Sequence, residues 1–241
     1  MSGHSHFAGI KHKKEANDAQ RGKIFSKFAR EITIAAREGA KVETNSKLRT
    51  VIEKAKAMNM PRDNIDRALV KGAGGGEGAN LEEVLFEAYG PGGAAILIQG
   101  ITDNNKRTVN EIKQILNQNN GKFVESGSVK WLFERKGIIV IPIKEDSGNP
   151  AKDDLEMKAI EAGAEDIYIG EETMEVYTRP ETLEPAHKAL EAMAIKLDSF
   201  NLGWVAKEEI TVDEKDKEAC QKMFEALDEN DAVTDVYSNI A

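Results

Sequence analysis

The chain has 241 residues, 40% of them hydrophobic, which suffices for one large domain or two to three small ones. Its single cysteine excludes an intramolecular disulfide and a cysteine-based zinc site. No apolar run reaches the roughly 18 residues of a membrane-spanning helix, and residues 1–6 are too polar for a secretory signal, so we expect a soluble cytoplasmic protein.

Charge is distributed unevenly along the chain. The formal net charge is −9, but residues 1–75 contain 16 Lys and Arg against 8 Asp and Glu, a net charge of +8. The remaining residues contain 17 basic and 34 acidic side chains, a net charge of −17. This asymmetry indicates a basic binding module attached to an acidic body.

The basic region has the periodicity of helices. Apolar residues recur at three- and four-residue spacing in residues 25–36, 48–58 and 65–69. Asn45 or Ser46 is suited to cap the second helix, and Pro61 separates the second from the third. A glycine-rich segment, residues 72–78, follows. The region is therefore predicted to be a small three-helix bundle that ends at a flexible connector.

After the connector the pattern is mixed. Predicted strands cover residues 84–89, 94–101, 129–133, 137–143, 165–169, 173–178, 202–206 and 232–237. Predicted helices lie around residues 109–116, 155–162, 183–194 and 220–227. Gly90-Pro91-Gly92-Gly93 has the composition of a turn between the first two strands.

The order of these elements predicts the domains. Residues 137–206 supply strand-helix-strand-strand-helix-strand, a complete ferredoxin-like unit. Residues 81–133 supply only strand-strand-helix-strand, and the C-terminal helix and strand would complete that sheet. We therefore expect an α + α/β multidomain fold with a three-helix domain (1–75) and two small α+β, ferredoxin-like domains. One is discontinuous (81–134 plus 207–241), and the other (135–206) is inserted in it.

The first helix carries a cationic stripe. On a helical wheel Lys27, Arg30 and Arg37 fall within about 40° of Lys23, opposite the apolar face, so the stripe should point outward. Lys and Arg neutralise phosphates without reading base sequence, although a solvated helix face explains the charges equally well. The candidate nucleic-acid-binding residues are Lys11, His12, Lys13, Lys14, Arg21, Lys23, Lys27 and Arg30.

Three further groups of residues have both a structural and a functional interpretation. Thr102-Asp103-Asn104 lies between a strand and a helix, where capping is the simpler role, and a partner contact by Asn104, Lys106 and Arg107 is the alternative. The acidic residues between 145 and 175 form no ligand-rich loop, so a solvated face is favoured over a metal or acid-base site. His187 has the spacing of a packing residue.

A series of short motifs runs along the chain: Gly3-His4-Ser5, Ile10-Lys11-His12-Lys13-Lys14, Asp18 to Lys27, Arg30-Glu31-Ile32, Asn59-Met60-Pro61, Tyr89-Gly90-Pro91-Gly92-Gly93, Thr102-Asp103-Asn104 with Arg107-Thr108, Gly127-Ser128-Val129 and Leu132 to Gly137. In these motifs and in their order the chain resembles the YebC/PmpR family. The family includes bacterial proteins described as probable transcriptional regulators and the mitochondrial translational activator of cytochrome oxidase. The resemblance implies one helical and two mixed domains, the third inserted in the second, and nucleic-acid binding without known catalysis.

Two functions remain open. One is a DNA-binding transcriptional regulator, and the other is a ribosome-associated translation factor that binds ribosomal RNA. The same cationic surface serves both, because the two nucleic acids share the phosphate backbone. A hydrolase is disfavoured, since no Ser-His-acid set or metal-ligand spacing is present. We expect no cofactor, no metal and no membrane partner, and a monomer in solution.

Overall fold

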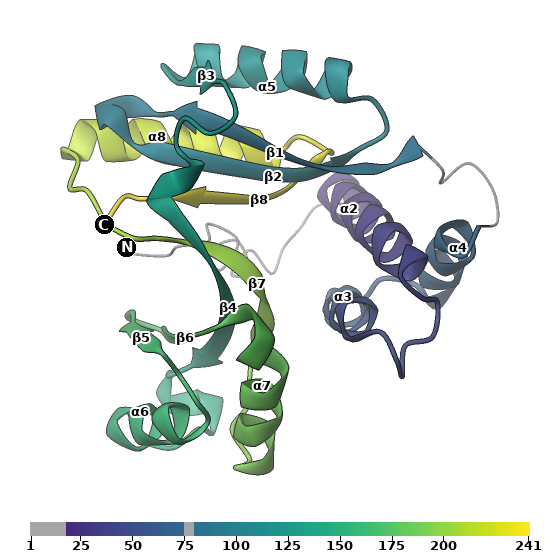
Figure 1. The fold of residues 1–241 in the computed structure, drawn as a ribbon, viewed down its shortest axis with the longest axis vertical. Coiled ribbons are helices and arrows are strands. Elements are labelled where there is room, and N and C mark those ends of the chain that lie inside the picture. Colours follow the sequence, from purple (N-terminus) through teal and green to yellow (C-terminus); the bar gives the residue numbers. More distant parts are fainter. Residues whose placement is uncertain (1–17, 75–79) are drawn as a thin grey trace. The chain divides into compact units, whose positions relative to one another are not determined.

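The computed structural model describes residues 18–74 and 80–241 (Figure 1). Contacts between residues divide this part of the chain into two compact units. Phe133–Val205 form one unit, and residues 18–74 and 80–132 form the other together with Ala206–Ala241. The segments that flank the first unit in sequence therefore belong to a single body.

The basic region contains three helices, as predicted: α2 (Asp18–Arg37), α3 (Ser46–Ala57) and α4 (Arg62–Gly72). Their apolar faces share one core, whose buried members include Phe28, Ile32, Leu48, Ile52 and Ile65. This arrangement confirms the periodicity of three and four residues as a sign of amphipathic helices.

Two residues define how these helices meet. Asn45 is the N-cap of α3: its Oδ1 accepts the N–H of Leu48 at 2.9 Å, and its amide nitrogen donates to two carbonyls at the end of α2. Gly72 ends α4 where a Cβ would lie only 2.4 Å from the carbonyl oxygen of Thr33. Only glycine allows α4 to approach α2 this closely.

The first sheet has the strand order β3-β1-β2-β8. Its antiparallel strands are β1 (Glu82–Tyr89), β2 (Ala95–Thr102), β3 (Lys122–Val124) and β8 (Val233–Ser238). Between β1 and β2 lies a 3-10 turn, η2 (Pro91–Gly93). The pairing of β8 with β2 confirms that the last strand completes this sheet, as the element count predicted.

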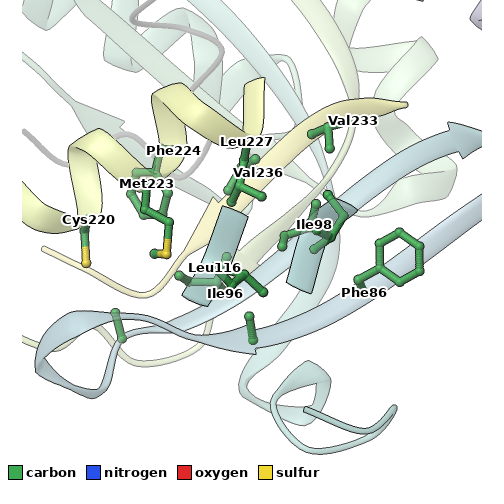
Figure 2. Close-up of a cluster of buried hydrophobic side chains, with 13 residues drawn as sticks. Phe86, Ile96, Ile98, Leu116, Cys220, Met223, Phe224, Leu227, Val233 and Val236 are labelled. Carbon is green, nitrogen blue, oxygen red and sulfur yellow. The ribbon is translucent and has the colours of Figure 1, made fainter. Parts of the chain in front are cut away.

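Two helices share a core with one face of this sheet: α5 (Asn105–Gln118) and α8 (Glu214–Asp228). Leu116 of α5 and Met223 and Leu227 of α8 meet alternate residues of the strands, among them Ile96 and Ile98 (Figure 2). Because side chains alternate across a strand, the neighbouring residues face the opposite side of the sheet. Leu97 and Ile101 on that opposite face are also buried, so this face is covered as well.

The second sheet, in the other unit, has the order β5-β6-β4-β7. Its strands are β4 (Phe133–Pro142), β5 (Asp166–Ile169), β6 (Thr173–Thr178) and β7 (Ser199–Ala206). The helices α6 (Lys152–Glu161) and α7 (Leu183–Ala192) contribute Leu155 and Leu190 to a core with Ile139, Ile141 and Val176. Two short 3-10 helices, η4 (Glu145–Ser147) and η5 (Pro180–Thr182), lie in its loops.

The predicted strand at residues 129–133 is wrong. A 3-10 turn, η3 (Lys130–Leu132), takes its place, and β4 begins only at Phe133. The cause is the buried Glu87 of β1, whose carboxylate accepts the backbone N–H groups of Gly127, Val129 and Lys130 at 2.6, 2.7 and 2.9 Å. These donors are therefore not available to a strand ladder.

Cys220 is buried where α8 meets the turn η2, and burial raises the pKa of its thiol to about 11. We expect the folded protein to react with a thiol-specific disulfide reagent at about pH 8 at least roughly 100-fold more slowly than the unfolded chain, because only the thiolate attacks. Absorbance of the released product measures both rates, and Cys220→Ser gives the blank. Equal rates with and without denaturant would contradict this assignment.

Candidate nucleic-acid interface

Three residues of the predicted cationic stripe lie against the turn that joins α8 to β8. Lys23 Nζ is 2.5 Å from Glu229 Oε2, and Lys27 Nζ is 2.9 Å from Asp228 Oδ1. Lys27 also donates to the carbonyl of Asp228, and Arg30 donates to the carbonyl of Asp231 at 2.6 Å. We call residues 228–231 the acidic turn.

The expectation that the stripe points outward is therefore wrong for Lys27, whereas Lys23 is exposed but pairs with the acidic turn. Lys27 is only 7% exposed, and its ammonium donates to the carbonyl and to the carboxylate of Asp228. The hydrogen bond to Glu229 raises the pKa of Lys23 above its ordinary value. The stripe does avoid the helical core, as the wheel predicted, but it meets a second surface that lies about 200 residues further along the chain.

The acidic turn is itself held in place. Asn230 donates from Nδ2 to Glu111 of α5 at 2.9 Å, and its Oδ1 accepts the N–H of Ala232 at 2.9 Å. The turn thus presents its carboxylates and carbonyls to α2 from a fixed position. Carboxylate and carbonyl oxygens are the same kind of acceptor that phosphate offers to Lys and Arg.

The far end of α2 and the start of α3 make similar contacts. Arg37 donates to the carbonyl of Leu81 at 2.7 Å, and Lys47 Nζ lies 2.8 Å from Glu83 Oε1 at the start of β1. One side of the helical region is therefore occupied by the sheet and its turns. The contacts explain why cations gather on this side without reference to an external ligand.

The other candidate cations lie either outside the described residues or exposed on the helices. Lys11, His12, Lys13 and Lys14 lie outside the described residues, and Arg21 is exposed on α2. Other cations on α3 and α4 are also exposed: Lys56, Arg62, Arg67 and Lys71. Two of these have neighbours on their own helix, since Arg62 lies 3.6 Å from Asp66 and Arg67 donates to Asn64. These helices therefore carry an accessible cationic surface that the sequence reasoning did not single out.

The second candidate group is organised around the start of α5. Asn104 is the N-cap, with Oδ1 accepting the N–H of Arg107 at 3.1 Å, which confirms the capping role. The Arg107 guanidinium lies 2.6 Å from Asp103 and 3.6 Å from Glu111, so acidic neighbours balance its charge. Lys106 is exposed. A partner contact by these three residues stays a prediction.

The acidic residues of the second sheet form surface ion pairs. Glu165 lies 2.8 Å from Lys136 and 3.1 Å from Arg179, and its hydrogen bond from Lys136 holds its pKa below the usual range. Glu172 pairs with Lys144 at 2.7 Å. Over residues 18–74 and 80–241, no cluster of His, Cys, Asp or Glu has a geometry that could hold a metal ion.

His187 fills a packing position, as predicted. Its imidazole stacks on the ring of Phe200 with the ring centroids 3.7 Å apart. In the part of the chain that the structure describes, no helix is both long enough and apolar enough to cross a bilayer.

Glu31 is an ionisable group that the sequence reasoning missed. It lines a small cavity with Lys47, Glu83, Gln99 and Asp235, where α2 and α3 face β1, β2 and β8. Burial, and then the nearby charge of Asp235, raise the pKa of Glu31 to about 7, although Lys54, Lys27 and Lys47 oppose the shift. No periodicity could reveal this, because the cavity residues Glu83, Gln99 and Asp235 are distant from Glu31 in sequence.

This carboxyl makes stability depend on pH. Its folded pKa of about 7 exceeds the ordinary value of 4.5, so the native state holds the extra proton between these values. Its contribution to the free energy of unfolding is therefore present below about pH 4.5 and is lost as the pH rises through about 7. Glu31→Gln should stabilise the protein at about pH 8 by on the order of 1 kcal/mol. It should also reduce the slope with which the free energy of unfolding falls as the pH rises.

Urea unfolding at a series of pH values measures the effect of Glu31→Gln. The matched control is Glu53→Gln on the exposed side of α3, which should leave the slope unchanged. An unaltered slope in Glu31→Gln would show that this carboxyl does not titrate in the expected window.

Comparisons with known proteins extend over the whole chain. A family model described as the TACO1/YebC protein N-terminal domain matches residues 5–75, and one described as the TACO1/YebC second and third domain matches residues 81–240. A probable transcriptional regulatory protein of Desulforamulus reducens is 45% identical over 240 residues, which cover 99% of this chain and 98% of that protein. One from Thermotoga maritima is 44% identical over 242 residues, 99% and 93% of the two chains.

A solved structure is also similar. The crystal structure of a conserved hypothetical protein from Aquifex aeolicus has a TM-score of 0.89 and 44% sequence identity, over 98% of this chain and 97% of that one. The curated relatives carry the names of regulatory proteins and not of enzymes. The two family models and the relatives confirm the resemblance found in the motifs, and the chain belongs to the TACO1/YebC family.

Proposed function

We propose that this protein is a non-enzymatic transcriptional regulator that binds DNA through the basic helical region, residues 1–75. The observation that carries the proposal is the separation of charge. Residues 18–74 contain 13 Lys and Arg against 7 Asp and Glu, a net charge of +6, whereas residues 76–241 have a net charge of −17. A polyanion is attracted to the first and repelled by the second.

Two parts of the region are proposed to contact phosphates. One is the segment with Lys11, His12, Lys13 and Lys14, and the other is the exposed side of α3 and α4 with Lys56, Arg67 and Lys71. Three cations of α2 would also contact phosphates once their contacts with the acidic turn are broken: Lys23, Lys27 and Arg30. These cations recognise the backbone and not the bases, so we expect weak sequence preference.

The relatives' names support the transcriptional role, since several are called probable transcriptional regulatory proteins. Ribosomal RNA offers the same phosphates, so the experiment includes RNA. Fluorescence anisotropy of labelled duplex DNA and of structured ribosomal RNA fragments, titrated with the full chain, compares the two. A clear preference for RNA at equal salt would overturn the DNA assignment.

Variants locate the surface. If roughly five to seven phosphates are neutralised, the affinity falls steeply with salt, and each cation lost should reduce the log-log slope by about 0.9. Lys11, Lys13 and Lys14→Ala should therefore weaken binding, and so should Lys56, Arg67 and Lys71→Glu. The matched control is Lys152 and Lys158→Glu on α6, outside the basic region. Equal binding by all of these variants would refute the proposed surface.

A further inference from the structure

Trp131 lies on the surface with 64% of its area exposed, in the 3-10 turn between β3 and β4. A single exposed apolar residue is common in proteins and needs no explanation by itself. Two further observations set this indole apart. The indole is fixed in position, and two lysines lie next to its residue: Lys130 precedes it, and Lys207 donates to its carbonyl.

The indole is held by a rigid loop. Its Nε1–H donates to the carbonyl of Ser128 at 3.0 Å, and the Ser128 hydroxyl donates to the carbonyl of Glu125 at 2.6 Å. Gly127 adopts a φ of +89°, which bends the loop. Beneath it, the buried Glu87 carboxylate accepts three backbone N–H groups of the loop. The ring face is therefore presented at little further entropic cost on binding.

Two exposed lysines lie next to this residue along the chain or at its backbone. Lys130 precedes Trp131 in the turn, and Lys207 follows β7. The backbone N–H of Lys207 donates to Leu132 and its Nζ donates to the carbonyl of Trp131, both at 2.9 Å. An ammonium has three donors, so Lys207 retains donors for a further acceptor. An exposed aromatic face on a residue with lysines next to its backbone matches a nucleobase with its flanking phosphates.

We propose that Trp131 is a stacking platform for an unpaired nucleobase of single-stranded nucleic acid, with Lys130 and Lys207 contacting the adjacent phosphates. Stacking on a tryptophan tolerates any base, because every base has a π face. A fully paired duplex does not offer such a face in its interior. The two lysines next to this residue fit a nucleotide better than the apolar core of a protein interface. The inference does not rest on the proposed function, because Trp131 lies outside residues 1–75.

Fluorescence tests this directly, because the chain has only two tryptophans. Trp204→Phe leaves Trp131 as the sole reporter, and the probes are oligo(dT), oligo(rU) and a duplex of equal length. Saturable quenching by the single strands, with much weaker quenching by the duplex, is expected. No quenching by any probe, or equal quenching by single strands and duplex, would overturn the proposal. The ratio between oligo(dT) and oligo(rU) compares a DNA with an RNA single strand as the ligand.

Affinity provides the second readout. Trp131→Ala should weaken single-strand binding about 10-fold and Trp131→Phe much less, while both keep the wild-type thermal stability, since the side chain is exposed. Lys207→Gln should reduce the salt dependence. Unchanged affinity of Trp131→Ala would also refute the site. If charge reversal on α3 and α4 leaves the Trp131 quenching intact, the two surfaces act separately, so either proposal can fail alone.

Discussion

Replacing Asp228 with Asn and Glu229 with Gln should raise the affinity for duplex DNA by roughly 10-fold, equivalent to about 1.4 kcal/mol. Both carboxylates now pair with cations of α2, at 2.9 Å from Lys27 and 2.5 Å from Lys23. A phosphate that approaches α2 must displace them and overcome their negative charge. The neutral amides keep the size of both side chains but remove this competition.

The control for the acidic turn removes the same amount of charge elsewhere on α8. Glu218→Gln with Glu225→Gln, both exposed, changes the total charge equally but makes none of the described contacts with α2. Anisotropy titrations at one salt concentration compare the two double variants. An affinity that rises equally in both would mean that total charge, and not the acidic turn, limits binding.

Stability separates competition from a purely structural role of the turn. If the turn only docks the helical region, Asp228→Asn with Glu229→Gln lowers the free energy of unfolding without any gain in affinity. The buried ammonium of Lys27 would then lack its charged partner, and removing one partner of a buried ion pair is costly. Urea unfolding of the double variant and its control measures this cost.

The sequence predicts the helical region well, and the reason is local. The core of α2, α3 and α4 depends on residues three and four apart, so the spacing of Phe28 and Ile32 suffices to place them inside. The same holds for Asn45 and Asn104, since capping involves only the next few residues. The cap geometry follows directly from residue type and position.

Features that depend on distant residues could not be predicted. Residues 129–133 have the composition of a strand, but the acceptor for their N–H groups is Glu87, about 40 residues away. The strand β3 was missed because it has three residues and little pattern of its own. A helical wheel distinguishes the core side of α2 from the other side, yet it cannot show that the other side meets the acidic turn.

The buried Glu87 supports the second large prediction: Glu87→Ala should lower the free energy of unfolding by about 3 kcal/mol. The variant removes three charge-assisted hydrogen bonds and leaves three backbone N–H groups without their acceptor. Although burial acts to raise the pKa of this carboxyl, the hydrogen bonds from Gly127, Val129 and Lys130 lower it below the usual range. Its contribution is thus present above the unfolded pKa and lost as the pH falls through the folded one.

Glu87→Gln separates the contribution of the negative charge to stability from that of an acceptor oxygen of the same size. The amide keeps an oxygen for one or two of the three N–H groups, so its free energy of unfolding should lie between those of the wild type and Glu87→Ala. Urea unfolding measures both variants, with the exposed Glu82→Gln of the same strand as the control for losing a carboxylate from β1. If the free energy of unfolding of Glu87→Ala equals that of the wild type, the loop that contains Gly127 to Lys130 does not need the Glu87 carboxylate for its stability.

The same variants connect the buried carboxylate to the surface indole. Because Glu87 fixes the loop that presents Trp131, releasing the loop should let the ring move and weaken stacking of a base on it. In the Trp204→Phe background, Glu87→Ala should lower the steady-state anisotropy of the Trp131 fluorescence and the affinity for oligo(dT), and Glu87→Gln should partly restore both. Loss of stability with unchanged anisotropy and affinity would confine Glu87 to a role in folding, because a preorganised platform requires both readouts to fall together.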